Sequence, residues 1–126
     1  MDALGPENQI EVPIIIQQGA DFSLPILVVD LINYVETPTD LTGWSAHMQG
    51  RLSYGSDETI FDISSTGGGI FINPTAGTIT CNIAGAVTAT FPIPTKGRYD
   101  LKIFDNTGAI DRYLQGPFYV SPEVTQ

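Results

Sequence analysis

The chain has 126 residues, of which 14 are acidic and 5 are basic, and its formal net charge is −9 at pH 7. This balance argues against nucleic acid as the main partner, because proteins bind phosphates with lysine and arginine. The length suits one domain, and a charged fraction of only 15% predicts a folded chain with a buried core. Four basic residues fall in the last third of the chain, which allows a local positive patch there: Lys96, Arg98, Lys102 and Arg112.

Targeting signals and cysteine chemistry are not evident in the sequence. No apolar run is long enough to span a membrane, and the N-terminus lacks a basic segment followed by an apolar one. We therefore expect neither a membrane span nor a secretory signal. Cys81 is the only cysteine, which excludes an intrachain disulfide and a multi-cysteine metal site. It alternates with Ile79 and Ile83, so we predict a buried thiol on one face of a strand.

The chain reads as a β protein from its first strand to its last. We expect a flexible arm over residues 1–8, one β-sandwich domain over residues 9–121 and a polar tail over residues 122–126. Short runs rich in β-branched and aromatic residues alternate with Gly and Pro. The predicted strands cover residues 10–17, 22–30, 44–51, 59–63, 70–72, 78–83, 99–104, 109–114 and 118–120. About seven to nine short antiparallel strands predict an all-β sandwich or a small barrel.

The connections carry their own predictions. Pro13 and Pro25 place the first two strands at sheet edges, because proline lacks the N–H that a central strand needs. Residues 33–40 are predicted to form a loop, and the glycine-rich residues 64–69 a flexible loop. Two hairpin turns are expected at residues 73–77 and 105–108, and one short helical turn within residues 84–91.

Two side-chain predictions concern the middle and the end of the chain. Trp44 begins an alternating run and is predicted to anchor the core, with His47 on the opposite, polar face of the strand. Asp100 and Arg112 lie on strands that would pair across the predicted 105–108 turn. They are candidates for a cross-strand ion pair, although two unconnected surface charges are an equally good interpretation.

Catalytic and metal-binding signatures are weak. His47 is the only histidine, and no Gly-x-Ser-x-Gly motif surrounds it, so we expect a solvated or interface residue rather than a catalytic base. One Cys and one His are too few for a zinc site, and the acidic residues do not follow a calcium-loop pattern. We therefore predict that the protein is not an enzyme, has no catalytic, cofactor-binding or metal-binding residues, and needs no cofactor.

Four segments of the chain match sequence motifs. Residues 17–26 (QQGADFSLPI) are similar to an opening strand pattern Q-G-x-x-F-x-L, and residues 40–49 (DLTGWSAHMQ) to the motif D-L-T-G-aromatic-x-A-x-M-Q. Residues 97–101 (GRYDL) resemble a G-x-Y-D-L strand opening. Residues 108–125 resemble an ending V-x-R-x-L-x-G followed by V-S-P-E-V-T. In this order the four segments resemble a family of small structural proteins of tailed phages, and the opening is also similar to the N-terminal domain of phage baseplate upper proteins.

The resemblance implies an immunoglobulin-like or related β-sandwich that docks on a phage tail or baseplate and does not catalyse a reaction. The expected role is an adaptor for fibres or neighbouring tail proteins, present in several copies in a symmetric assembly. The protein would be made in the host cytoplasm and act in the virion, with no nucleic-acid or membrane partner.

Two alternatives stay open. One is a head decoration or head-to-tail connector protein. The other is a carbohydrate-binding module on the tail, with the aromatic residues Trp44, Tyr54, Tyr113 and Tyr119 as its stacking platform.

Overall fold

The computed structural model describes residues 11–52, 58–92 and 95–122, and the side chains of all of these except residues 95 and 111–113. The predicted arm over residues 1–8 lies outside these ranges, as does most of the predicted tail.

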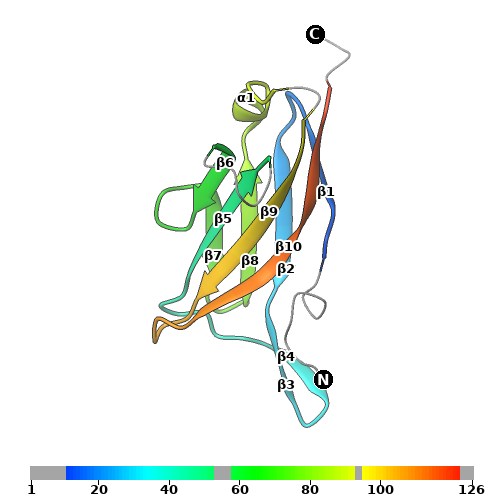
Figure 1. The fold of residues 1–126 in the computed structure, drawn as a ribbon. Helices are drawn as coiled ribbons and strands as arrows, with labels where there is room; N and C mark the ends of the chain where they lie inside the picture. The colour runs from blue at the N-terminus through cyan, green and yellow to red at the C-terminus, as the bar shows by residue number, and fades with distance from the viewer. Residues whose placement is uncertain (1–10, 53–57, 93–94, 123–126) are drawn as a thin grey trace.

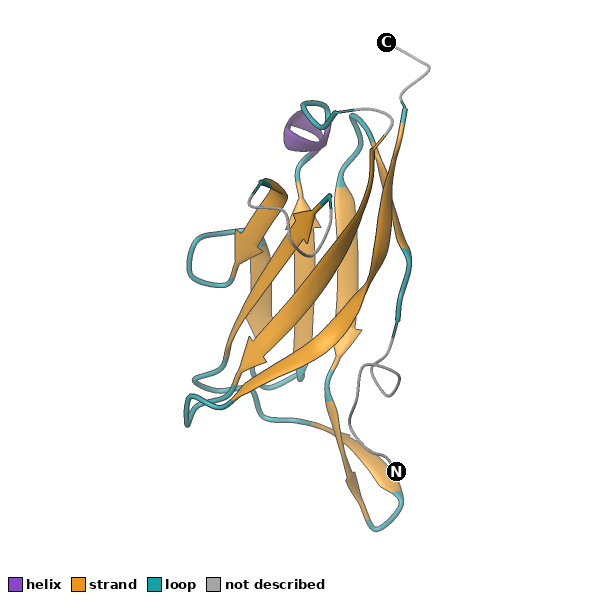
Figure 2. Cartoon of the chain, in the orientation of Figure 1, coloured by secondary structure: helices purple, strands orange, loops and turns teal. Residues whose placement is uncertain are grey.

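Two sheets pack face to face across one core (Figure 1). The larger sheet has five strands in the order β1-β10-β9-β5-β6, and the smaller has three in the order β2-β8-β7. Figure 2 shows that strands dominate the fold. The larger sheet contains β1 (Ile14–Gln17), β5 (Ser45–Arg51), β6 (Thr59–Ser64), β9 (Thr95–Phe104) and β10 (Ile110–Ser121). The smaller sheet contains β2 (Phe22–Leu27), β7 (Ile70–Asn73) and β8 (Thr78–Ile83). The all-β prediction is confirmed.

Strand direction departs from the prediction in one place. β1 runs parallel to β10, from the pair Ile14–Phe118 to the pair Gln17–Ser121, whereas every other pair in the two sheets is antiparallel. The expectation of an entirely antiparallel fold is therefore wrong for β1. Alternation and proline content indicate an edge strand, but they do not indicate which way that strand runs along its neighbour.

The core is built from alternating residues of both sheets. Met48 of β5 and Leu101 of β9 are fully buried, and so are Ile79 and Cys81 of β8. Their sequence neighbours point to the other side of each sheet, as strand geometry requires. The predicted burial of Cys81 is confirmed, and burial raises the pKa of its thiol to about 12.

Several local predictions are confirmed. Pro13 directly precedes the edge strand β1, and Pro25 lies inside the edge strand β2. The hairpins β7–β8 and β9–β10 form at the predicted turns, and the predicted helical turn is α1 (Gly85–Thr88). None of the described helices is long and apolar enough to cross a membrane. The glycine-rich segment 64–69 is a turn in which Ser64 and Gly68 exchange backbone hydrogen bonds of 3.0 and 2.9 Å.

Residues 33–40 do not form the predicted loop. β3 (Val29–Ile32) and β4 (Val35–Pro38) pair antiparallel as a separate two-stranded sheet, which projects from one end of the molecule (Figure 1). We call this hairpin, residues 29–38, the arm; it is a different segment from the N-terminal arm predicted over residues 1–8. Its turn residues, Asn33 and Tyr34, have φ angles of 52° and 65°, as a type I′ hairpin turn requires. The usual signal for this turn is Asn-Gly, and a tyrosine in the second position concealed it.

One prediction about the last strands is wrong. Residues 118–120 are not a separate strand, because β10 continues without a break from Ile110 to Ser121. The hairpin register places Arg112 opposite Lys102, and a shift between Arg112 and Leu114 places Asp100 opposite Gln115. Asp100 and Arg112 are therefore diagonal rather than directly opposite, and because the Arg112 side chain lies outside the described parts, an ion pair between them stays a prediction.

Trp44 is only partly the predicted core anchor. It directly precedes β5 and its side chain is half-buried, packed against the edge of the core. The aromatic centre of the core is instead Phe61, whose ring centroid lies 5.3 Å from that of Phe118 and 6.3 Å from that of Phe91.

Gly50 makes room for this aromatic cluster, and its replacement should destabilise the fold. A Cβ atom at Gly50 would approach the Phe61 ring to 2.2 Å, so the ring would have to move against its aromatic neighbours. We expect Gly50→Ala to lower the free energy of unfolding by about 1–3 kcal/mol, measured by urea denaturation. Ser23→Ala, at an exposed position of β2, is the control and should have little effect. An unchanged midpoint for Gly50→Ala would contradict this packing.

Candidate functional site

The outer face of the five-stranded sheet gathers the basic residues of an acidic protein. The inward positions of β5 are Ala46, Met48 and Gly50, so His47, Gln49 and Arg51 point outward. The same alternation on β9 sends Lys96, Arg98, Asp100 and Lys102 outward. We call the outer surface of β5 and β9, with Arg51, Lys96, Arg98 and Lys102, the basic face. The fifth basic residue of the chain, Arg112, lies on the neighbouring strand β10.

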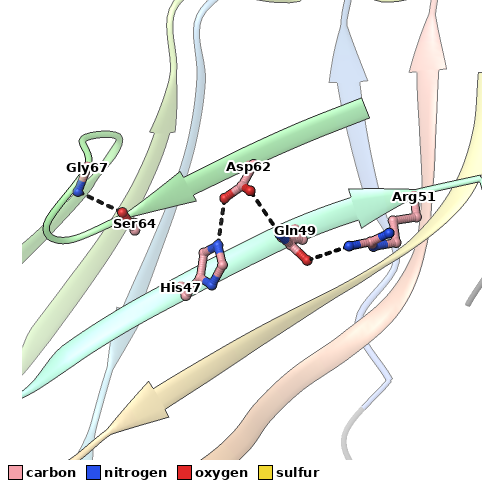
Figure 3. Close-up of polar contacts among 6 residues, drawn as sticks. All are labelled: His47, Gln49, Arg51, Asp62, Ser64 and Gly67. Carbon is pink, nitrogen blue, oxygen red and sulfur yellow. Dashed lines mark hydrogen bonds and ion pairs between the residues drawn. The ribbon is translucent and has the colours of Figure 1, made fainter. Parts of the chain in front are cut away.

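A chain of polar contacts crosses from β6 to β5 on this face (Figure 3). His47 Nε2 lies 2.6 Å from Asp62 Oδ1, and Gln49 Nε2 donates to Asp62 Oδ2 at 2.8 Å. Arg51 Nη2 donates in turn to Gln49 Oε1 at 3.2 Å. Side chains two residues apart on one strand share a face, which is why His47 and Gln49 both reach the Asp62 carboxylate and Arg51 reaches Gln49.

The surroundings of Asp62 keep its carboxylate charged. Burial would raise its pKa, but the hydrogen bonds from Gln49 and His47 and the charges of His47 and Arg51 outweigh burial, and the pKa lies below its ordinary value of 3.8. The side chains of His47 and Asp62 are 39% and 47% exposed, so water screens the pair. The pair therefore orients the two side chains more than it stabilises the fold.

Two shallow hollows meet at His47. The first is about 290 Å³ in volume and lies over β5 and β9, between Gln49, Arg98 and Lys102. The second is about 250 Å³ and lies between Ser45, Ser64 and Phe104. Both are open depressions lined by charged, hydroxyl and amide groups, which suits a protein surface or a polar ligand better than an enclosed apolar small molecule.

The N-terminal side of the basic face is covered by residues that precede β1. Arg98 Nη2 lies 2.9 Å from Glu11 Oε2, and Gln115 Nε2 donates to the same oxygen at 3.1 Å. Tyr99 donates its hydroxyl proton to the carbonyl oxygen of Val12 at 2.6 Å. Glu11 therefore occupies the Arg98 end of the face, whereas the Lys102 end lies away from it along β9.

The His47–Asp62 pair resembles part of a hydrolase triad, but the nucleophile is not in place. A serine nucleophile would hydrogen-bond to the histidine ring. The nearby Ser64 Oγ instead accepts a hydrogen bond of 2.7 Å from the Gly67 amide (Figure 3), and in the part of the chain that the structure describes no serine hydroxyl bonds to His47. The arrangement is suited to holding a partner, and the absence of enzymatic activity stays a prediction.

The candidate residues for a metal site and for an aromatic stacking platform are considered next. Within the described ranges, no group of three or more His, Cys, Asp or Glu side chains could hold a metal ion. Asp105 is a turn residue whose carboxylate accepts hydrogen bonds from the Thr107 hydroxyl and amide, and these bonds lower its pKa. Of the four aromatic residues proposed as a stacking platform, Trp44 and Tyr119 are half-buried; Tyr54 and the Tyr113 side chain lie outside the described parts.

The sequence located His47 on a polar face but not its partner. Asp62 occupies a polar position in the predicted strand 59–63, and that strand follows the His47 strand along the chain. Pairing consecutive strands as a hairpin would have brought the two side chains to one face, but the register depends on the intervening segment. The arm was missed altogether, because its residues were divided between a strand and a loop.

The Asp62 contacts predict a dependence of stability on pH. Because the pKa of Asp62 is lower in the folded protein than in the unfolded chain, its contacts stabilise the fold above about pH 4 and lose that effect as the pH falls further. Asp62→Asn should therefore reduce stability at pH 7, by no more than about 1 kcal/mol for so exposed a pair, and the difference should shrink as the pH falls below about 4. Urea midpoints at pH 7 and over a series of lower pH values measure it.

Asp30→Asn serves as the matched control, because Asp30 on the arm forms no ion pair with a described side chain. It replaces an exposed carboxylate in the same way but removes no such contact, so any effect of the substitution itself is measured beside that of Asp62→Asn. A difference for Asp62→Asn that stays the same at every pH would rule out the stabilising role of the polar chain.

Comparison with known proteins adds no relative: the chain matches no protein-family model, and no curated protein matches its sequence.

Proposed function

We propose that this protein is a non-enzymatic structural and assembly protein of a tailed-phage virion, most simply an adaptor of the tail or baseplate. The observation that carries the assembly role is the arm. Leu31 is 68% exposed, Ile32 55%, Tyr34 96% and Val35 61%. Four adjacent large apolar side chains held away from the body of a domain are typical of a surface that is covered by another protein.

The energetics of the arm support the same conclusion. A two-stranded hairpin with no third strand and no packed face is marginal in water. Its base, however, is fastened to the domain: Val28 donates its amide to the Gly77 carbonyl at 2.8 Å, and Thr39 donates to the Val28 carbonyl at 2.9 Å. An arm that is anchored at its base and apolar at its tip fits a docking element better than a passive loop.

The strand order supports an immunoglobulin-like sandwich of the variable type. The sheet β10-β9-β5-β6 corresponds to strands G, F, C and C′ of that fold, and β2-β8-β7 to strands B, E and D. In this correspondence the arm is an insertion in the B–C connection, at the end of the sandwich that also carries the β9–β10 turn (Figure 1). Connections at the ends of such sandwiches commonly make the contacts with partners.

The placement in a phage tail is supported by the four sequence segments described above. An adaptor has to contact several neighbours, and this domain offers three separate surfaces: the arm, the basic face and the free edges of β1 and β6. A head decoration or connector protein would use the same surfaces, so the location in the particle has to be measured.

Gold-labelled antibody against this protein, viewed on intact particles by negative-stain electron microscopy, tests the proposal. We expect label at the tail end. Label on the capsid or neck would instead assign the protein to decoration or connection. Particles that carry no label and, after disruption, contain no peptide of this protein by mass spectrometry would overturn the virion role. Particles of an unrelated phage are the control for antibody specificity.

A further inference from the structure

We propose that the arm of one copy docks on the basic face of a second copy, at its Lys102 end. This inference rests on the proposed assembly function and names the partner of the arm. The receiving surface, called the docking patch, comprises His47, Lys102, Phe104 and Ile110.

The arm combines apolar side chains with negative charge. Cross-strand pairing places Leu31 beside Glu36 on one face of the hairpin, and Asp30 beside Thr37 on the other. Residues 29–38 contain these two carboxylates and no basic residue. A partner for the arm therefore has to offer both apolar contact and positive charge.

The docking patch offers both. Phe104 of β9 is paired with Ile110 of β10 in the sheet, and Ile110 is 63% exposed. Two residues earlier on β9, Lys102 points to the same side, and its register partners on either side are His47 and Arg112. The hollow of about 250 Å³ between His47 and Phe104 adjoins these side chains and can receive the tip of a hairpin.

The positive charges of the chain are concentrated on this face. All 5 basic residues lie on β5, β9 and β10, whereas the 14 acidic residues are spread over the chain, with Asp62 and Asp100 also on this face. The arm of one copy is therefore repelled by most of a second copy and attracted by its basic face. Among the described side chains none forms an ion pair with Lys102, so its ammonium group can meet Asp30 or Glu36 while its methylene groups cover apolar side chains.

The contact has to be between copies. In one copy the tip of the arm is exposed, with Tyr34 at 96%, so the arm does not fold back onto its own sheet. Two copies can exchange arms in a closed two-fold dimer. An arm that is not returned by the neighbour makes a head-to-tail contact, which closes into a ring or continues as a filament.

Sedimentation of the full-length chain over a concentration series tests the contact. We expect association that increases with protein concentration, and a weakening of this association as the salt concentration rises. The double substitution Leu31→Ser/Tyr34→Ser removes the arm contact, and Lys102→Glu reverses the charge of the docking patch. Each variant alone should associate at least about tenfold more weakly. Ile110→Ser provides a second, uncharged variant of the patch.

Mixing the variants is the decisive measurement. The Lys102→Glu protein keeps an intact arm, and the arm variant keeps an intact patch, so an equimolar mixture should form a 1:1 dimer that does not grow. Phe71→Ser and Lys96→Glu are matched controls. Phe71 is 64% exposed on the other sheet, and Lys96 lies six residues, or about 20 Å, from Lys102 on β9, so both variants should associate like the natural protein.

Three outcomes overturn the inference: a natural protein that stays monomeric, variants that associate as strongly as it does, or a mixture that does not pair although circular dichroism shows both variants folded. A monomeric protein that still labels phage particles would mean that the assembly function stands and the partner is a different protein. Self-association without particle labelling would leave the contact intact and remove the virion role.

Discussion

The division of β9 into two faces is the constraint on which both the core and the basic face depend. Tyr99, Leu101 and Ile103 point inward and are at most 3% exposed, whereas the residues between and before them include the basic ones. A register slip of one residue would place the lysines in the core and the apolar side chains in water. The burial of the three apolar residues therefore also determines where the charges stand. Lys96, Arg98, Asp100 and Lys102 follow one another on the outer side because the core side of the strand is continuous.

The glycines of the central strands make this arrangement possible. Gly50 on β5 and Gly97 on β9 leave space for the rings of Phe61 and Phe118, and a Cβ atom at Gly97 would also approach the Arg51 carbonyl oxygen to 2.2 Å. The large side chains come from β6 and β10 and fill the space that the glycines vacate. Interlocking of this kind requires one register, because only one alignment brings each ring over a glycine. The polar outer face and the dense inner face are thus two results of one alignment.

Much of the fold followed from alternation, proline and turn residues, and the failures have physical causes. The turn residues Asp105–Gly108 predicted the β9–β10 hairpin, and alternation in residues 44–51 predicted both faces of β5. The arm was missed because Tyr34 adopts a φ of 65°, a conformation for which a bulky residue gives no sequence signal. Its strands also lack the regular alternation of a half-buried sheet, since neither face of the hairpin is buried. The polar chain around Asp62 could not be found without the β5–β6 register, which no local pattern specifies.

The exposed apolar side chains of the arm and the concentration of basic residues on β5, β9 and β10 have a common explanation when several copies are considered together. A strongly acidic chain resists non-specific association, which protects a protein that carries apolar side chains on an exposed hairpin. The same repulsion would oppose every contact between copies unless one surface carried positive charge. Confining every lysine and arginine to three neighbouring strands creates such a surface, and the acidic residues within the arm make the arm responsive to it. Charge then selects where copies meet, while Leu31, Ile32, Tyr34 and Val35 supply the apolar area that holds them together. Because the arm and the basic face are different surfaces of one domain, every contact joins an arm to a face, and an arm or a face that is left free can bind a further copy.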